Sequence, residues 1–190
     1  FRIAPPNTKY QFEKLDLNTI EGAIAGIKSP NLATRYLAWN KLHELQEQAE
    51  SQLEVLYQTD NQRNRARALW LLAGIKGKAN QYVERAIKDE NPDIRITGLR
   101  AARRYKLDVI PYVKQLVKDP SPQVRRECAI ALHHNQSSAA PELWGTLADQ
   151  YDGKDRWYLE ALGIGMDEQE SKFMSAWLKQ AGDNWDTPVG

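Results

Sequence analysis

An arginine that returns every thirty residues is the feature that most restricts how this chain can fold. It stands in five similar segments, with steps of 30, 30, 30 and 31 residues, at Arg35, Arg65, Arg95, Arg125 and Arg156. Two segments match closely, NPDIRITGLRAA from Asn91 and SPQVRRECAIAL from Ser121. A fixed period of this length is typical of a solenoid, in which each repeat packs only on its neighbours.

The residues before each arginine predict the start of a helix. Four residues upstream stand side chains that can accept hydrogen bonds from the amides of a first helical turn. They are Asn31, Asn61, Asn91, Ser121 and Asp152. Pro92 and Pro122 follow two of these residues at the first helical position, where a missing N–H costs nothing. Each repeat is therefore expected to begin its second helix at its own cap.

Apolar and small residues keep the same register, which predicts one buried helical face. Three and seven residues after each arginine stand Ala38, Ala68, Gly98, Cys128 and Leu159, then Leu42, Leu72, Ala102, Leu132 and Gly163. A shorter upstream helix is marked by Leu53, Val83, Val113 and Leu143, and by Ile27, Tyr57, Ile87, Val117 and Leu147. Each repeat is thus predicted to be a helix, a tight turn and a second helix, and stacking buries the stripes that no single unit could cover.

The predicted fold class is all-α, a right-handed α-α superhelix (solenoid) of about five to six helical repeats. Residues 1–16 are expected to be a linker and the tail of a preceding domain, residues 17–182 the repeat domain, and residues 183–190 a linker. The repeats are placed at about 17–48, 49–78, 79–108, 109–140 and 141–169, with a partial repeat at 170–182. A mean hydropathy of -0.66 agrees, because a solenoid has more surface per residue than a sphere.

Three segments carry a resemblance to known proteins. Asp89 and Asp119 before the turn, with Arg95 and Arg125 early in the second helix, resemble HEAT repeats of the short bacterial type. More narrowly, NPDIRITGLRAAR, DPSPQVRRECAIAL and YDGKDRWYLEALGIG resemble the HEAT region of a bacterial family of membrane-bound dehydrogenases. In that family a β-propeller precedes the HEAT repeats and a haem-binding CxxCH segment follows them.

The resemblance implies a spacer or interaction module of a larger exported protein, periplasmic or in the cell envelope, which as a whole would be a redox protein. FRIAPP would then be the last propeller strand. These 190 residues contain no CxxCH, so no haem ligand is assigned and no cofactor is expected in this segment.

The repeat arginines favour a structural role. An arginine one turn into a helix, next to a turn that bears Asp, usually forms ion pairs within and between repeats, and exposed pairs contribute little stability. We therefore interpret one set as a structural ladder: Arg35, Arg65, Arg95, Arg125 and Arg156, with Asp89 and Asp119.

A second set of residues predicts an interaction face. Positions one, five and eight after the repeat arginine gather aromatic and arginine side chains on one side of the second helices, the helices that line the concave side of HEAT-like solenoids. The predicted face consists of Tyr36, Trp70, Arg100, Arg103, Arg126, Ile130, His133 and Trp157. Because aromatic residues and Arg are enriched at binding hot spots, we expect this face to dock another protein or a neighbouring domain of the same chain.

No residue set resembles a reaction centre, so the segment is predicted to be non-catalytic. Lys+Arg 26 against Asp+Glu 25 gives a formal net charge of +1, which argues neither for nor against nucleic acid. No nucleic acid is expected as a partner, because repeats one, two and five mostly lack a basic stripe. A HEAT-like DNA-binding or DNA glycosylase domain remains an alternative because Arg100, Arg103 and Arg104 form a short basic stripe. A tetrapyrrole-handling HEAT protein is another alternative.

Two further absences are expected from the sequence. His133 and His134 have no Cys, Asp or Glu at ligand spacing on the same helix, so no metal site is predicted. No run of about 18 or more apolar residues occurs, so no membrane contact is predicted from this segment.

Overall fold

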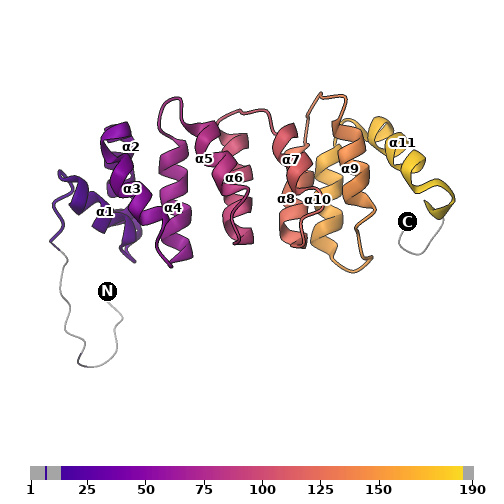
Figure 1. The fold of residues 1–190 in the computed structure, drawn as a ribbon. Helices are drawn as coiled ribbons and strands as arrows, with labels where there is room; N and C mark the ends of the chain where they lie inside the picture. Colours follow the sequence, from indigo (N-terminus) through magenta and orange to yellow (C-terminus); the bar gives the residue numbers. More distant parts are fainter. Residues whose placement is uncertain (1–6, 8–13, 186–190) are drawn as a thin grey trace.

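The computed structural model describes residue 7 and residues 14–185, and every regular element in this part of the chain is helical (Figure 1). The elements are α1 (Ile20–Lys28), α2 (Leu32–Leu45), η1 (Gln46–Ala49), α3 (Glu50–Tyr57), α4 (Gln62–Ala73), α5 (Ala79–Ala86), α6 (Pro92–Arg104), α7 (Ile110–Leu116), α8 (Pro122–Ala131), α9 (Ala140–Ala148), α10 (Arg156–Met166), α11 (Glu170–Ala181) and η2 (Gly182–Trp185). The predicted propeller strand and most of both predicted linkers lie outside the described residues. Within those residues, no helix is both long and apolar enough to cross a membrane.

The helices form two packed rows. Within a repeat the shorter first helix packs on the second, as α3 does on α4 and α5 on α6. The second helices α4, α6, α8 and α10 also pack side by side, and so do the first helices α1 with α3 and α7 with α9. Figure 1 shows the pairs following one another along one direction from α1 to α11. The predicted all-α solenoid of repeated helical pairs is confirmed.

Most second helices begin at the predicted caps. The side chains of Asn31, Asn61 and Asn91 accept amide hydrogen bonds in the first turns of α2, α4 and α6. Ser121 occupies the cap position of α8, but its Oγ donates to Gln123 Oε1 at 2.9 Å instead of capping the helix. The local sequence therefore selects the starting points of these helices, although Ser121 does so without its side chain.

The predicted cap Asp152 is wrong. The helix α10 is capped by Asp155, whose carboxylate accepts the amides of Trp157 and Tyr158. Asp152 lies earlier in the turn, where its Oδ1 accepts the amides of Lys154 and Asp155 at 2.9 and 3.1 Å. The hydrogen bonds to these two amides lower the pKa of the Asp152 carboxyl. Asp152 thus stabilises the loop that precedes α10.

This loop is longer than the equivalent turn of the other repeats. Val117, which follows the last residue of α7, stands four residues before the cap Ser121, whereas the equivalent Leu147 of α9 stands eight residues before the cap Asp155. The four extra residues are accommodated by a loop in which Gly153 has a φ of 73°. The repeat step from Ser121 to Asp155 is therefore 34 residues, which moves everything after the loop out of the predicted register.

The predicted core positions in the second helix of the last repeat are wrong for the same reason. Leu159 is 53% exposed and Gly163 is exposed, whereas Leu162 is buried in the place predicted for Leu159. In the first helix, which precedes the loop, the predicted Leu147 is buried, but Leu143 is half-buried and the neighbouring Trp144 is buried instead. The earlier repeats keep the predicted buried columns, from Ala38 and Leu42 to Cys128 and Leu132.

Small residues let neighbouring helices approach closely, both between the two rows and within one row. A Cβ atom at Gly98 of α6 would lie 2.8 Å from Cβ of Ala86 in α5, too close for two carbon atoms. At Gly165 of α10 it would lie 2.5 Å from the carbonyl oxygen of Ala129 in α8. Glycine at these two positions is thus required by the spacing between helices.

The single cysteine is expected to be unreactive in the folded chain. Cys128 is fully buried, and burial, with the charges of Asp119 and Glu127, raises the pKa of its thiol. Since the thiolate is the nucleophile, modification must wait for local opening. We expect labelling by a disulfide reagent at pH 8 to be at least about 100-fold slower in the native chain than in denaturant. Rapid labelling of the native chain would contradict the packing around α8.

Candidate functional site

Two of the ladder arginines, Arg65 and Arg95, tie their repeat to the turn of the next. Arg95 Nη1 donates to the carbonyls of Asp89 and Glu90, in the turn before its own helix, at 2.8 and 2.9 Å. Its Nε and Nη2 donate to Oδ2 and Oδ1 of Asp119, in the following turn, at 2.7 and 2.8 Å. Asp119 Oδ1 also accepts the amide of Ser121 at 2.9 Å. This arginine therefore fixes two successive turns at once.

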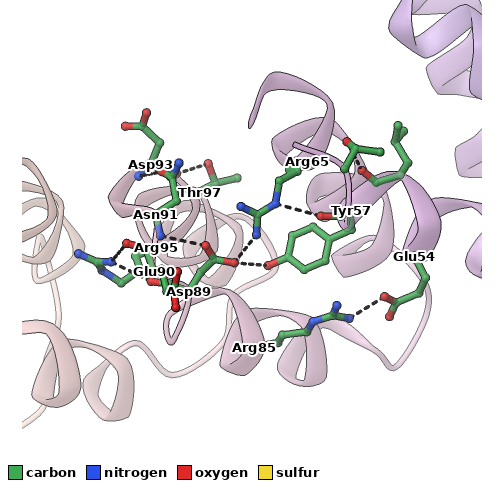
Figure 2. A network of polar contacts seen from close by, with 12 residues as sticks. Glu54, Tyr57, Arg65, Arg85, Asp89, Glu90, Asn91, Asp93, Arg95 and Thr97 are labelled. Carbon is green, nitrogen blue, oxygen red and sulfur yellow. Dashed lines mark hydrogen bonds and ion pairs between the residues drawn. The ribbon is translucent and has the colours of Figure 1, made fainter. Parts of the chain in front are cut away.

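The preceding junction repeats the arrangement, as Figure 2 shows. Arg65 forms an ion pair with Asp89 and donates from Nε to the carbonyl of Tyr57 at 3.0 Å. Asp89 Oδ1 accepts the amide of Asn91 at 3.0 Å. The guanidinium of Arg85 lies 4.6 Å from the centre of the Tyr57 ring, a cation–π distance. Like Asp119, Asp89 thus pairs with the arginine of the preceding repeat and accepts an amide hydrogen bond within its own turn.

Arg35 and Arg125 also bind a turn, but neither pairs with an aspartate of the next repeat. Arg35 donates to the carbonyl of Ser29 at 2.8 Å, and Arg125 to the carbonyl of Asp119 at 2.7 Å. The guanidinium of Arg125 lies 5.6 Å from the centre of the Tyr158 ring, and its Nε is 3.4 Å from the tyrosine hydroxyl. At the junction of α8 and α10 the repeat arginine thus contacts an aromatic ring instead of an aspartate, and the ion pair is formed by the neighbouring Arg126, 3.6 Å from the cap residue Asp155.

Arg156 does not belong to the ladder, which corrects the sequence prediction. It is the first residue of α10, its side chain is 82% exposed, and its Nε lies 3.3 Å from Glu160 on the same helix. The four extra residues of the preceding loop place it one turn too early. The arginine at the expected spacing is a coincidence of sequence.

The second helices α6, α8 and α10 line an open groove of about 820 Å³. It is lined by Pro92, Asp93, Ile96 and Arg100 of α6, by Gln123, Arg126, Glu127 and Ile130 of α8, and by Trp157, Glu160, Ala161 and Ile164 of α10. The predicted interaction face contributes Arg100, Arg126, Ile130 and Trp157. Trp157 is 69% exposed. The groove thus gathers an exposed aromatic ring, apolar walls and two guanidinium groups.

The other four residues of the predicted face lie elsewhere. Tyr36 is exposed on α2, at the far end of the row, and Trp70 is half-buried on α4 against the core. Arg103 lies beside the groove, and His133 lies at the end of α8. The structure therefore brings together half of the predicted face, at its C-terminal end.

Glu127 is a groove residue that the sequence reasoning missed. Its side chain is buried, and it accepts hydrogen bonds from Arg100 Nε at 2.8 Å and from Arg103 Nη1 at 3.3 Å. Two guanidinium groups thus compensate one buried carboxylate, and the Arg100 side chain remains 59% exposed with unused N–H donors. The sequence could have indicated this contact, since Arg100 and Arg103 precede Glu127 by about one repeat and equivalent positions of neighbouring repeats lie close together.

The lining of the groove mixes apolar and charged side chains. It includes no Ser, Thr, Cys, His or Lys, and its acidic groups are the carboxylates of Asp93, Glu127 and Glu160. Asp93, Glu127 and Glu160 offset Arg100 and Arg126, so the surface is not basic. Apolar walls with a few fixed polar groups are the usual composition of a polypeptide-binding surface.

Comparison with known proteins agrees with the repeats seen in the structure. The family model described as HEAT repeats matches residues 50–132 and again residues 79–163. A search of the curated proteins found no match. The two matched ranges together cover more than half of the 190 residues and include α6, α8 and most of α10. The chain therefore belongs to the HEAT-repeat family.

Proposed function

We propose that this chain is a non-catalytic interaction module that binds a polypeptide in the groove across α6, α8 and α10. The observation that carries the proposal is Trp157, 69% exposed beside Ile130, Ile164 and Arg100. Burying an apolar side chain of this size contributes roughly 1.5–3 kcal/mol. Trp and Arg are also the residues that most often dominate the binding energy of protein interfaces. A scaffold role agrees with the HEAT family.

The chemistry of the lining favours one kind of occupant, a protein segment that carries apolar side chains next to a carboxylate. Ile96, Ile130 and Ile164 supply one apolar position from each helix. Arg100 keeps donors that are not used by Glu127, and such a guanidinium binds a carboxylate through two parallel hydrogen bonds. The partner would be another protein or a neighbouring domain of the same chain.

Nucleic acid fits the groove less well. A phosphate backbone would approach Asp93, Glu127 and Glu160 together with the two arginines, so the net electrostatic attraction is small. The groove also offers no His, Cys or Met side chain that could hold the iron of a haem. These features support a polypeptide partner over the DNA-binding and tetrapyrrole alternatives.

The larger protein is a separate part of the proposal. The likeness of residues 91–165 to the HEAT region of the membrane-bound dehydrogenase family supports a spacer role in an exported protein of the periplasm or cell envelope. The reading frame around Phe1–Gly190 tests it. A propeller-like sequence upstream and a CxxCH segment downstream would support this parent, and a frame without them would discard it.

The groove can be tested without knowing the natural partner. A library of displayed peptides is selected on the purified chain, and the affinity of a selected peptide is measured by fluorescence anisotropy. Trp157→Ala and Arg100→Ala are each expected to weaken binding by about 5-fold or more, because a hot-spot residue contributes at least about 1 kcal/mol. The matched control is Tyr36→Ala, another exposed aromatic on a second helix but outside the groove, which should bind normally. Equal loss with all three variants would contradict the proposal.

A further inference from the structure

A cluster of metal-ligating side chains lies beyond the groove, where α8 and α10 end. His133 Nε2 is 3.4 Å from Asp167 Oδ2, and His134 Nε2 is 3.4 Å from Glu168 Oε2. His134 Nε2 is also 4.0 Å from Asp167 Oδ2. One ligand atom from each of His133, His134 and Asp167 lies within 4.8 Å of the other two. No residue of this cluster lines the groove.

The repeat architecture explains why these residues meet. His133 and Asp167 are 34 residues apart, and so are His134 and Glu168, which is the step between the caps Ser121 and Asp155. The two pairs therefore occupy equivalent positions of neighbouring repeats. His134 and Glu168, with φ of 56° and 62°, both adopt the left-handed conformation that turns the chain after a helix.

The prediction of no metal site rested on the sequence of one helix. It found no acid at ligand spacing near His133 and His134, and within that helix none exists. The acids come instead from the next repeat, in a register set by the longer loop before α10. In a repeat protein, neighbours in space are one repeat apart in sequence, so ligands from two repeats can meet without any signal within one helix.

The spacing of the groups suits a small divalent ion. In a tetrahedral site with bonds of about 2.0–2.1 Å, neighbouring ligand atoms are about 3.3–3.4 Å apart. Two of the three His–carboxylate distances are 3.4 Å, and the third, from His134 to Asp167, is 4.0 Å. The imidazoles stack with centroids 3.7 Å apart, and because both side chains are partly exposed their rings can turn toward an ion. Imidazole nitrogen with carboxylate oxygen is a ligand set that Zn²⁺ accepts.

We propose that His133, His134 and Asp167, with Glu168 as a fourth ligand, form a site for a divalent transition-metal ion such as Zn²⁺. The ion joins repeats four and five. It does so at the junction where Arg125 contacts the Tyr158 ring and where Arg126 lies 3.6 Å from Asp155, a longer contact than the ion pairs of the two preceding junctions. The metal thus adds an electrostatic link between α8 and α10, the helices that form one wall and the centre of the groove.

The test is calorimetric titration of the chelator-treated chain with zinc chloride at pH 7.5. The expected result is one ion per chain and a rise in Tm of about 2–4 °C at saturation. His134→Ala and Asp167→Asn should each weaken binding by about 10-fold or more. Their side chains are largely exposed, so both variants should keep the helical circular dichroism of the parent.

The matched control is His43→Ala, which removes the remaining histidine of the chain, exposed on α2. It should bind zinc as the parent does. Cobalt substitution gives an independent readout, because a tetrahedral N/O site produces visible absorption bands that His134→Ala should abolish. Zinc binding weaker than about 1 mM, or equal binding by the parent and His134→Ala, would overturn the proposal.

Discussion

Replacing Asp119 with alanine is expected to lower the free energy of unfolding by about 3–5 kcal/mol. Asp119 is buried, and its carboxylate accepts two hydrogen bonds from Arg95 and one from the amide of Ser121. The Arg95 side chain is itself only 11% exposed, so the substitution leaves a buried guanidinium without a counter-charge. It also removes the contact that joins the turn before α8 to the helix α6.

Urea denaturation followed by circular dichroism measures the free energy of unfolding of Asp119→Ala, and two further variants serve as controls. Arg156→Ala removes an exposed arginine with the same sequence spacing and should change stability by less than about 0.5 kcal/mol. The double substitution Arg95→Met and Asp119→Leu should recover much of the loss, because apolar residues of similar volume often replace a buried ion pair without cost. A loss below about 1 kcal/mol for Asp119→Ala would show that the ladder is not structural.

Replacing Phe173 with alanine is the second large effect, an expected loss of about 3–5 kcal/mol. Phe173 is the fully buried residue of α11, and its ring packs edge-on against Trp144 with centroids 5.9 Å apart. Trp144 in turn donates from Nε1 to the carbonyl of Leu162 at 2.9 Å. Phe173 therefore fastens α11 onto α9 and closes the C-terminal end of the core.

The loss should begin at that end of the molecule. Because each repeat is stabilised chiefly by its neighbours, hydrogen exchange should rise in α9, α10 and α11 before it rises in α4 or α6. The control is Leu178→Ala on the same helix, 43% exposed, which should cost less than about 1 kcal/mol. A uniform rise in exchange along the chain would contradict this account of α11 as a cap.

Local sequence predicts most of the fold because each repeat carries its own signals. Asn61 and Asn91 cap their helices as predicted, and Leu42, Leu72 and Leu132 are buried at the predicted spacing. In the last repeat the cap and the buried positions of the second helix were not predicted, because a loop insertion carries no periodic signal. Asp152 and Asp155 are equally able to cap a helix, and burial of Tyr158 and Leu162 decides for Asp155.

The candidate site was predictable only in part. Helical period places Arg126 and Ile130 on one face of α8, but it does not say which repeats form a groove deep enough to bind a partner. Tyr36 occupies the same position of its repeat and yet lies outside the groove. The contact between Arg100 and Glu127 depends on how neighbouring helices are offset, which follows from packing and not from the local pattern.

Cross-linking from a selected peptide tests the central claim most directly. A photoreactive benzophenone replaces one apolar residue of the peptide, and the linked residues of the chain are identified by mass spectrometry. Our account predicts links to the groove, at Ile96, Ile130, Ile164 or their neighbours on α6, α8 and α10, and loss of these links in Trp157→Ala. Links concentrated on α1 to α4, unchanged in Trp157→Ala, would contradict the groove as the binding surface of this solenoid.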